Sequence, residues 1–453
     1  MYMSRLFGTD GVRGIANQEL TPDLAYKLGW AGAQVLAGEC QHRPTILIGS
    51  DTRISCGMLE AALISGINSA GADVYVCGVI PTPGIAYLTR KYQCDAGVMI
   101  SASHNSFEYN GIKLFSSKGY KLPDEIEDHI EQLVRAYDPA DCDRPTGAAV
   151  GRRIEKKNAS RDYVEHLKRR MSVDLTGMKI ALDCANGACA HIAPGLFSDL
   201  GADVVAIGTE PDGCNINDGC GSTHLERLRQ LVRREGCDIG IAFDGDTDRM
   251  LAVDENGRDV DGDVIMAIIA LDMHEANELH DDTLVVTVMS NLGLDLMARE
   301  KGIKLVKTKV GDRYVLEEML RHGFSIGGEQ SGHIILLEHA TTGDGMLSAL
   351  RLLRALAHQK TNLSSASGIM TVLPQVLKSS RVANERKAAA MADQDILSAI
   401  AKMEERLHGE GRVLVRPSGT EPIIRVMLEG RDIEEITRMT DQLTELISSR
   451  YGL

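Results

Sequence analysis

The stretch IGIAFDGDTDRMLAVD, residues 239–254, decides the fold class because it places an acidic loop between two apolar runs. The runs Ile239–Phe243 and Met250–Val253 are short and apolar, which is typical of buried strands. We expect them to form a hairpin that turns at Asn256-Gly257, a dipeptide that favours tight turns between strands. The loop holds three aspartates on alternate positions: Asp244, Asp246 and Asp248.

These three carboxylates indicate a metal site. Carboxylates so close together repel one another, and a bound divalent cation relieves the repulsion. A solvated acidic turn is the alternative. An EF-hand shares the spacing, but it requires glycine where Arg249 stands and a helix on each side of the loop. An aspartyl-phosphate phosphatase with Asp244 as nucleophile is a further competitor, but it requires Thr or Val where Asp248 stands.

Outward from this stretch, short β-branched runs alternate with helical periodicity, which is typical of α/β layers. Three buried strands are predicted at 45–48, 179–182 and 283–288, and each ends in a polar loop. This pattern resembles one α/β unit used three times. Apolar residues at intervals of three and four predict a helix after Pro123 and another that ends at Gly236.

The chain of 453 residues is long enough for about three or four domains. The pattern of predicted elements changes in the last quarter of the chain, where helices are predicted near 395–407 and 433–447 and two strands flank 416–422. We therefore expect an α/β fold with three related mixed α/β domains and a smaller C-terminal α+β domain. Polar and turn-rich stretches place the domains at 1–155, 156–257, 258–368 and 369–453.

The formal net charge of -15 disfavours nucleic acid or an anionic membrane as a partner, because a negative field repels both. An anionic substrate would require positive charge to be concentrated locally. Residues 1–14 show no basic segment followed by an apolar stretch, and no run reaches the roughly 18 apolar residues of a membrane span. The ten cysteines show no CxxC spacing, which favours scattered reduced thiols. The chain is expected to be cytoplasmic.

Ser103, in the stretch SASHN at 101–105, offers a nucleophilic hydroxyl on a loop, although a plain surface serine is the alternative. A hydrolase triad is disfavoured, because adjacent side chains such as Ser103 and His104 rarely reach base-to-nucleophile geometry. No GxSxG elbow surrounds them either. Ten residues on, Lys113 can return to the same pocket.

Two further stretches carry groups that bind sugars and phosphates. GGEQSGH, residues 327–333, joins small residues to a carboxylate, a hydroxyl and an imidazole, which together can hydrogen-bond several sugar hydroxyls. A glycine-rich turn with incidental polar residues is its alternative. RPSGTEP, residues 416–422, with Arg425 beyond it, supplies two guanidiniums, two hydroxyls and free backbone N–H groups for a phosphate dianion.

Together these segments resemble the α-D-phosphohexomutase superfamily over essentially the whole chain. The order FGTDGVRG at 7–14, then SASHN, DGDTDR, GGEQSGH and RPSGTEP, matches that family's four-site layout. Within the superfamily the chain is most similar to the bacterial phosphoglucosamine mutases. The segments that carry this finer resemblance are KVGDRY at 309–314, Gln330, and CGSTH at 220–224.

The resemblance implies a phosphoserine domain, a metal-binding domain, a sugar-binding domain and a phosphate-binding domain around a central cleft. Ser103 would be the phosphorylated serine and would ligate one Mg²⁺ together with Asp244, Asp246 and Asp248. Proton transfer or charge stabilisation would fall to Arg13, Lys113 and His333, with the pKa of Lys113 lowered by the cation and an arginine. The resemblance assigns the remaining substrate contacts to His104, Arg249, Glu329, Ser331, Arg416, Ser418, Gly419, Thr420 and Arg425.

The implied reaction interconverts glucosamine 6-phosphate and glucosamine 1-phosphate through a 1,6-bisphosphate, on the way to UDP-N-acetylglucosamine. A phosphoglucomutase or phosphomannomutase is the alternative, and a homodimer is common among the relatives. Two positions depart from the family pattern. Ser106 stands where Pro is usual, which predicts a less rigid serine loop, and Ser50 stands where many members have Arg.

Overall fold

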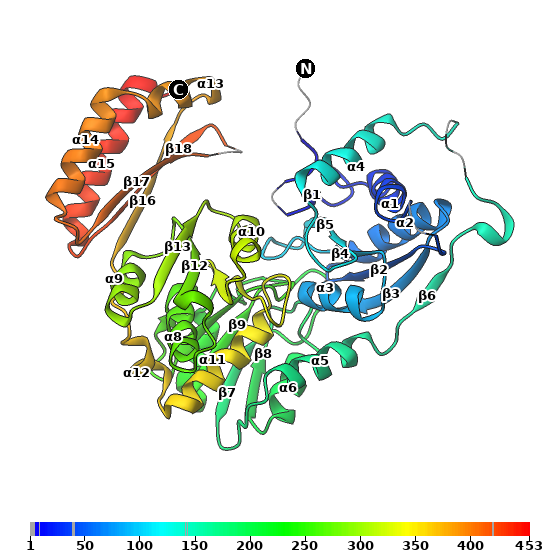
Figure 1. Cartoon of the computed structure of the whole chain (residues 1–453), viewed down its shortest axis with the longest axis horizontal. Helices are drawn as coiled ribbons and strands as arrows, with labels where there is room; N and C mark the ends of the chain where they lie inside the picture. The colour runs from blue at the N-terminus through cyan, green and yellow to red at the C-terminus, as the bar shows by residue number, and fades with distance from the viewer. Residues whose placement is uncertain (1–4, 9, 39–40, 141, 143, 419–420) are drawn as a thin grey trace. The chain divides into compact units, whose positions relative to one another are not determined.

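A computed structural model describes residues 5–8, 10–38, 41–140, 142, 144–418 and 421–453. The chain forms two compact units, one of residues 1–289 and 302–369 and the other of residues 290–301 and 370–453. The first unit contains three mixed sheets and the second contains one antiparallel sheet (Figure 1). The expected α/β fold class, with three mixed α/β sheets and a smaller C-terminal α+β part, is confirmed.

The first sheet has the order β1-β5-β4-β2-β3-β6. Its strands are β1 Val12–Ile15, β2 Thr45–Ser50, β3 Asp73–Val79, β4 Ala96–Ile100, β5 Tyr109–Ser116 and β6 Arg153–Glu155. The accompanying helices are α1 Pro22–Ala37, α2 Cys56–Ser69, α3 Thr82–Lys91 and α4 Asp124–Ala136. Helices α1 and α2 lie side by side (Figure 1), and their apolar faces share one core with the sheet.

The second and third sheets have the orders β11-β10-β9-β7-β8 and β13-β12-β14-β15. The second comprises β7 Lys179–Asp183, β8 Asp203–Ile207, β9 Ile239–Phe243, β10 Met250–Asp254 and β11 Asp259–Val260, with α5 Ala159–Arg170, α6 Ala193–Asp199 and α7 Glu226–Glu235. The third comprises β12 Thr283–Thr287, β13 Lys304–Thr308, β14 Ile326–Gly328 and β15 Ile334–Leu336, with α8 Gly262–Glu275, α10 Asp312–His322, α11 Gly345–Gln359 and α12 Leu363–Ser367.

The same four-strand arrangement occurs in all three sheets. A first strand (β2, β7 or β12) lies between two parallel neighbours, and the second of these neighbours (β4, β9 or β14) pairs antiparallel with the strand that follows it. The prediction of one α/β unit used three times is therefore confirmed. The three stretches singled out for chemistry follow these second neighbours: SASHN comes directly after β4, DGDTDR comes directly after β9, and GGEQSGH begins within β14. Equivalent loops of three repeats thus carry different chemical groups.

The predicted strands and helices lie where the periodicity placed them. Helix α4 begins directly after Pro123, and α7 ends at Gly236, whose left-handed φ of 62° lets its N–H reach the carbonyl of Val232. The predicted hairpin turn is wrong in one respect: Asn256-Gly257 joins β10 to β11, whereas β9 and β10 are joined by the aspartate loop itself. The acidic loop is flanked by strands, which excludes an EF-hand.

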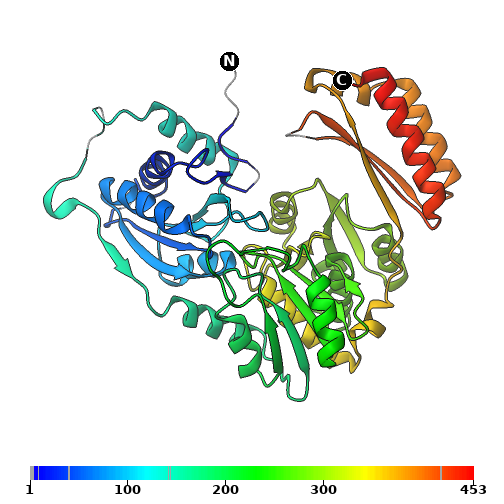
Figure 2. The ribbon, with the colours of Figure 1, turned by 180° about the vertical axis from the view of Figure 1, so that it is seen from behind.

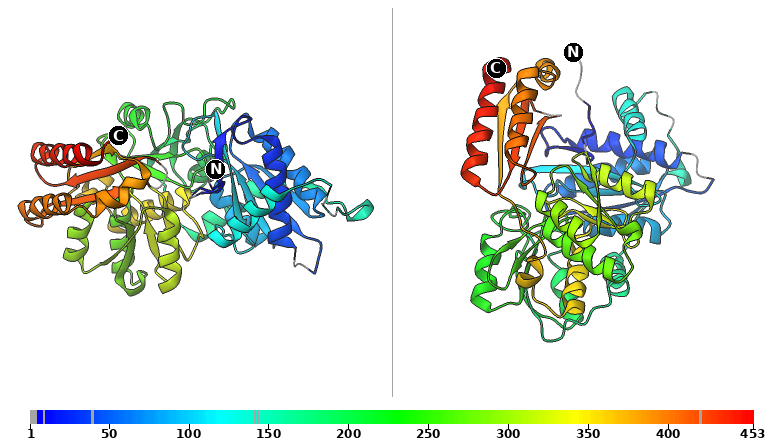
Figure 3. Two further views of the ribbon diagram at one scale, coloured as in Figure 1. Left: turned by 90° about the horizontal axis from the view of Figure 1, so that it is seen from above. Right: turned by 60° about the vertical axis from the view of Figure 1, so that its left-hand side comes forward.

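The second unit contains a three-stranded antiparallel sheet in the order β16-β18-β17. Its elements are α9 Leu292–Lys301, β16 Gln375–Arg381, α13 Asn384–Met391, α14 Gln394–Arg406, β17 Arg412–Pro417, β18 Ile423–Glu429 and α15 Ile433–Tyr451. Helices α14 and α15 lie side by side against this sheet (Figures 2 and 3), and their apolar residues join its own core cluster. This is the small α+β part predicted from the helices and strands expected after residue 369.

No helix among the residues described combines the length and apolar composition needed to cross a bilayer. The cysteines whose placement is described are all free thiols, as the absence of paired spacing predicts.

Asp344 begins helix α11 and links it to α5. Its carboxylate accepts a hydrogen bond from the Leu347 N–H (3.0 Å) and another from the Tyr163 hydroxyl (2.8 Å). Burial raises the pKa of Asp344 from 3.8 to about 6. The folded protein therefore favours the protonated carboxyl, and the stability from this group is fully present below pH 3.8 and lost as the pH rises through about 6.

Replacing Asp344 with asparagine is expected to reduce the pH dependence of stability. Asparagine caps helices as well as aspartate does, but it does not ionise. From pH 5 to pH 8, the free energy of unfolding should fall by about 1 kcal/mol less in the variant than in the wild type. This follows because a shift of one pKa unit corresponds to about 1.4 kcal/mol. Urea denaturation of both proteins at the two pH values measures this difference. Equal pH dependence in the two proteins would show that Asp344 does not titrate in this way.

Candidate active site

The serine loop follows β4 and presents Ser103 in a strained backbone conformation. Ser103 has a φ of 54°, and only 1% of its surface is exposed. Its hydroxyl donates a hydrogen bond to Asp244 Oδ2 at 2.6 Å and lies 3.4 Å from His104 Nδ1. The first and second sheets therefore bring the predicted nucleophile and a predicted metal ligand into direct contact.

Arg53 holds the serine loop in this conformation. Its guanidinium donates hydrogen bonds to the carbonyls of Ser103 (3.0 Å), Asn105 (2.8 Å), Ser106 and Tyr109 (3.1 Å). A buried ion pair with Asp51 (2.9 Å) fixes the guanidinium in turn. The loop thus has a clamp even though Ser106 replaces the usual proline. Arg53 was not among the predicted site residues, and its only sequence signal is its place in the polar loop after β2.

Replacing Arg53 with methionine is expected to cost about 3–5 kcal/mol of stability, because it leaves the Asp51 carboxylate buried without its cation. It should also lower turnover by about 100-fold, because small displacements of a reacting group have effects of that size. Arg152→Met is the matched control, since the Arg152 side chain is exposed and its partner, the buried Asp73, keeps a second cation in Arg43. Loss of Arg152 should therefore cost at most about 1 kcal/mol. Urea denaturation and steady-state kinetics test both variants, and similar losses in the two would contradict the clamp.

The acidic loop gathers three buried carboxylates. One ligand oxygen from each of Asp244, Asp246 and Asp248 lies within 4.8 Å of the others. The Oδ1 atoms of Asp246 and Asp248 are buried and have no hydrogen-bond partner in the described part of the chain, which is costly unless a cation satisfies them. Gly245 lets the serine loop approach this closely, because a Cβ at that position would lie 2.6 Å from the Ser103 carbonyl oxygen. The residues present therefore fit a divalent cation with oxygen ligands, such as Mg²⁺.

The surroundings shift the pKa values of two of the aspartates in opposite directions. Burial, with the charges of Asp248 and Asp246, raises the pKa of Asp244 well above its usual range. Asp246 is buried too, but the Lys113 ammonium at 2.7 Å and the Thr82 hydroxyl at 2.5 Å outweigh burial and hold its pKa below its usual range. A cation bound between these carboxylates would favour the ionised form of all three.

Lys113 and Arg13 are brought to the same acidic cluster by the pairing of β1 with β5. Arg13 donates to Asp10 Oδ2 at 2.5 Å, and the Lys113 ammonium lies 2.8 Å from the same oxygen. Lys113 is 1% exposed, and although burial lowers its pKa, the carboxylates of Asp10, Asp246 and Asp248 outweigh burial and raise it. The predicted lowering of the lysine's pKa is wrong for these side chains by themselves, because three neighbouring carboxylates outweigh one neighbouring arginine.

His104 and Arg249 flank the point where Ser103 meets the aspartates. The Arg249 backbone N–H donates to Asp244 Oδ1 (3.1 Å), and its guanidinium lies 3.9 Å from Asp248 Oδ1. Burial, together with the charges of Arg249 and Arg13, lowers the pKa of His104 to about 4. The imidazole is therefore neutral at pH 7, and it can accept or donate a hydrogen bond.

The GGEQSGH loop lies against the acidic loop. The Met250 N–H donates to the Gly332 carbonyl (3.1 Å), and Gly345, beyond β15, donates to the Thr247 carbonyl (2.9 Å). His333 is buried, with Nε2 accepting from the Gly343 N–H (3.3 Å) and Nδ1 without a partner. Among the described residues the Ser331 hydroxyl also has no hydrogen-bond partner. Both are buried polar atoms with unused hydrogen-bonding capacity.

Lys121 and Asp312 join the sugar-binding candidates to the acidic cluster. Asp312 lies 3.5 Å from His333 Nε2 and pairs with Lys121, which also pairs with Asp10. Because Asp10 pairs with Lys113, a series of alternating charges runs from Asp312 through Lys121, Asp10 and Lys113 to Asp246. Neither Lys121 nor Asp312 was predicted as a site residue, although Asp312 lies in the KVGDRY segment. Glu329 accepts the Gly311 N–H at 3.1 Å, close to the same segment.

The phosphate-binding candidates lie in the second unit. Arg416 on β17 stands opposite Arg425 on the neighbouring antiparallel strand β18. Burial and the Arg425 charge lower the pKa of Arg416. Ser418 accepts a hydrogen bond from the Glu421 N–H (3.2 Å), and Lys387 on α13 donates to the Ser418 carbonyl (2.7 Å). Two guanidiniums on facing positions fit a doubly charged anion. The predicted contacts Gly419 and Thr420 lie outside the described residues.

Comparison with known proteins covers the whole chain. Sequence models of phosphoglucomutase/phosphomannomutase match in four consecutive parts. Alpha/beta/alpha domain I matches residues 4–141, domain II 161–257, domain III 261–372, and the C-terminal domain 377–446. The predicted order of four domains is the order of these matches, while the exact boundaries stay predictions.

Curated relatives match over nearly their full length. A phosphoglucosamine mutase from Ruminiclostridium cellulolyticum is 58% identical over 450 residues, which cover 99% of this chain and 100% of the relative. One from Acetivibrio thermocellus is 55% identical with the same coverage. At this level of identity the resemblance found in the sequence is confirmed.

Solved structures show the same fold. A phosphoglucomutase/phosphomannomutase family protein from Burkholderia thailandensis aligns with a TM-score of 0.83 over 100% of both chains, at 23% identity. N-acetylphosphoglucosamine mutase from Aspergillus fumigatus, in complex with GlcNAc-6P and magnesium, aligns with a TM-score of 0.67 over 98% of this chain and 95% of its own, at 17% identity. The chain belongs to the phosphoglucomutase/phosphomannomutase family.

Proposed function

We propose that this enzyme is a mutase that interconverts glucosamine 6-phosphate and glucosamine 1-phosphate, with Ser103 as the residue that carries the phosphoryl group. The observation that carries the proposal is the buried Ser103 hydroxyl, 2.6 Å from one of three clustered aspartates. The relatives at 55–58% identity bear the name of this activity. The product would feed UDP-N-acetylglucosamine synthesis.

The aspartates and the Ser103 oxygen would hold one Mg²⁺, which when bound would neutralise charge on the transferring phosphoryl group. Lys113, at 2.7 Å from Asp246, adds a fixed positive charge beside the same oxygens. Because this ammonium is held in its charged form by three carboxylates, its role before substrate binds is charge stabilisation rather than proton acceptance.

In the forward reaction the bond between Ser103 Oγ and phosphorus breaks, and a bond forms between phosphorus and a sugar hydroxyl oxygen. The hydroxyl proton passes to a base in the site, and His333 and the neutral His104 imidazole are the candidates. The resulting bisphosphate turns around, the serine oxygen attacks the other phosphorus, and the proton returns. Atoms and charges therefore balance over one cycle, and the phosphoserine is restored.

Two sets of binding groups are proposed. Glu329 and Ser331 are proposed to hydrogen-bond the sugar hydroxyls, which suits a sugar that must bind in two orientations. Arg416, Ser418 and Arg425, with Gly419 and Thr420, are proposed to hold the phosphate that is not transferred. Arg249 and His104 are proposed to contact the phosphoryl group that is transferred. The cytoplasmic location and the homodimer stay predictions.

The substrate preference tests this proposal. We expect kcat/KM for glucosamine 6-phosphate to exceed that for glucose 6-phosphate and mannose 6-phosphate, because a site that pairs a polar substituent discriminates against analogues lacking it. Each substrate is assayed with the same enzyme and the same bisphosphate activator. Faster turnover of a neutral hexose phosphate would instead favour a phosphoglucomutase or phosphomannomutase, the activities that the family models name.

A further inference from the structure

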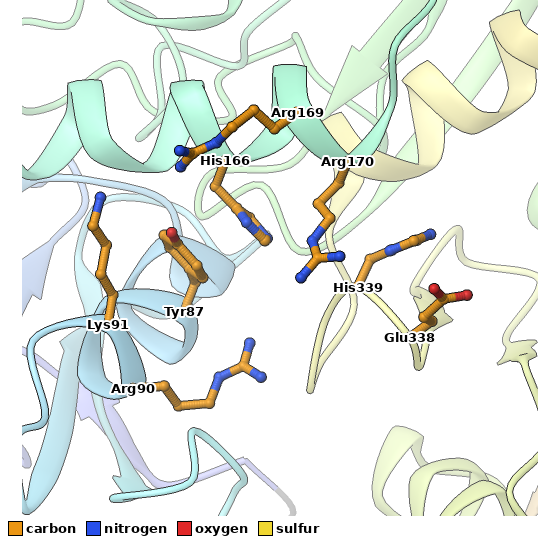
Figure 4. A pocket seen from close by; sticks show the side chains of 8 residues that line it. All are labelled: Tyr87, Arg90, Lys91, His166, Arg169, Arg170, Glu338 and His339. Carbon is orange, nitrogen blue, oxygen red and sulfur yellow. The ribbon is translucent and has the colours of Figure 1, made fainter.

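A basic hollow lies away from the acidic cluster. It has a volume of about 510 Å³ and is bounded by the C-terminal ends of α3 and α5 and by the turn after β15. Figure 4 shows the side chains of Arg90 from α3 and Arg170 from α5 extending into the same space. Its size is that of a small-molecule site rather than of a single bound ion.

The arginines of this hollow lack carboxylate partners. Across the described residues, no carboxylate oxygen lies within 4.0 Å of the guanidinium of Arg90, Arg169 or Arg170, whereas Lys91 is paired with Asp162 at 3.2 Å. Glu338 is the single acidic residue of the lining. In a chain with a net charge of -15, three uncompensated arginines around one hollow are a strong local exception.

These positive charges repel one another. The pKa of Arg90 is lowered by burial and also by the charge of Arg170. Burial lowers the pKa of His166 to about 4, and the charges of Arg170, Arg90 and Arg169 add to that effect. The hollow therefore keeps unfavourable like-charge energy that a bound anion would relieve.

A stacked pair of rings forms one side of the hollow. The rings of Tyr87 and His166 are stacked, with centroids 3.8 Å apart and an interplanar angle of 15°. His166 is 8% exposed, so this stacked pair is largely buried and joins α3 to α5 beside the hollow.

Stabilisation of helix ends explains only part of this arrangement. Basic residues in the last turns of α3 and α5 complement the helix dipoles, at about 0.3–1 kcal/mol each. That effect requires each cation to lie near its own helix end. It does not require arginines of two helices to line one hollow while, among the described residues, no carboxylate oxygen lies within 4.0 Å of their guanidinium groups.

We propose that this hollow is a binding site for a di- or triphosphate anion. Guanidinium groups bind phosphate oxygens in pairs, and Arg90 and Arg170 both extend into the hollow. Arg169, whose Nε donates to the Glu165 carbonyl (3.1 Å), adds positive charge at its rim. The site is separate from the proposed catalytic site. Thr82, which contacts Asp246, is the first residue of α3, and Arg90 lies near the other end of that helix. At 1.5 Å per residue, Thr82 and Arg90 are about 12 Å apart along the helix axis.

Tripolyphosphate binding, measured by calorimetry in buffer with EDTA, tests the proposal. The background is Arg416→Gln/Arg425→Gln, which removes the other proposed phosphate site, and this protein is expected to bind one tripolyphosphate. Adding Arg90→Gln and Arg170→Gln should raise Kd at least tenfold. Arg161→Gln, on an exposed residue of α5 that does not line the hollow, should leave Kd unchanged.

The results of these binding measurements either support or overturn the proposed phosphate site. If the background protein binds no tripolyphosphate, or if Arg90→Gln/Arg170→Gln leaves Kd unchanged, the proposal is overturned. Arg170→Lys keeps the charge and should weaken binding by less than Arg170→Gln, so it serves if the double variant does not fold. Tighter binding of ATP than of tripolyphosphate would indicate a nucleoside triphosphate, and equal binding the phosphate chain alone. AMP binding as tightly as ATP would contradict recognition of the phosphate chain.

Discussion

Ser103→Ala is expected to lower mutase turnover by about 10⁴-fold or more, because the variant has no oxygen on which the phosphoryl group can be carried. Binding of the sugar phosphate should change little, since the proposed phosphate-binding residues Arg416 and Arg425 lie in the other unit and remain intact. Steady-state kinetics give the first quantity, and calorimetry with glucosamine 6-phosphate gives the second.

Ser106→Ala is the matched control for this variant. Ser106 lies on the same loop, but its carbonyl and not its hydroxyl is held by Arg53. We expect this control to keep turnover within a few-fold of the wild type. An active Ser103→Ala protein would remove the proposed mechanism, whereas loss of both turnover and binding in that variant would indicate a damaged fold.

Asp248→Asn is expected to weaken Mg²⁺ binding at least about 100-fold. Even removing a residue that only orients a metal ligand costs about 10- to 100-fold in affinity, and Asp248 supplies a buried oxygen that has no other partner. Turnover at a fixed, low Mg²⁺ concentration should fall accordingly. Adding Mg²⁺ in excess should restore part of it, because Asp244 and Asp246 remain.

The same substitution is expected to raise the thermal stability of the protein in EDTA. The Asp248 charge is one reason that ionised Asp244 is disfavoured in the folded protein, so its removal relieves repulsion. Thermal unfolding with and without Mg²⁺ should therefore show a large Mg²⁺-dependent increase in the wild type and a small one in the variant. Asp218→Asn, an exposed aspartate in the same part of the chain, is the control and should match the wild type. A variant still stabilised by Mg²⁺ as strongly as the wild type would exclude Asp248 as a ligand.

The contiguous parts of the site could be predicted from sequence, because the chain itself places their residues together. Asp244, Asp246 and Asp248 share one short loop, so their proximity follows from the spacing alone. Lys121 and Asp312 are separated by 191 positions, and their ion pair depends on how the first and third sheets pack. Nothing in the local pattern of either residue indicates the other.

Two errors have identifiable physical causes. Asn256-Gly257 is a strong hairpin signal, and it does form a turn, but the β9–β10 connection is a loop in which Thr247 adopts a left-handed φ of 64°. Threonine rarely adopts a left-handed conformation, so the residue type at position 247 did not predict a turn there. The pKa of Lys113 was predicted to be lowered by the cation and the arginine, whereas without the cation the carboxylates of Asp10, Asp246 and Asp248 raise it. Asp10 comes from a distant part of the chain and was not considered.

Phosphopeptide mapping of the enzyme during turnover tests the central claim most directly. Active protein is quenched in acid while it converts glucosamine 6-phosphate, digested, and analysed by mass spectrometry with and without hydroxylamine treatment. A phosphoryl group on the peptide that contains Ser103, stable to hydroxylamine, is the predicted result. A fully active enzyme with no phosphate on that peptide, or with a hydroxylamine-sensitive phosphate on the peptide that contains Asp244, would contradict the account.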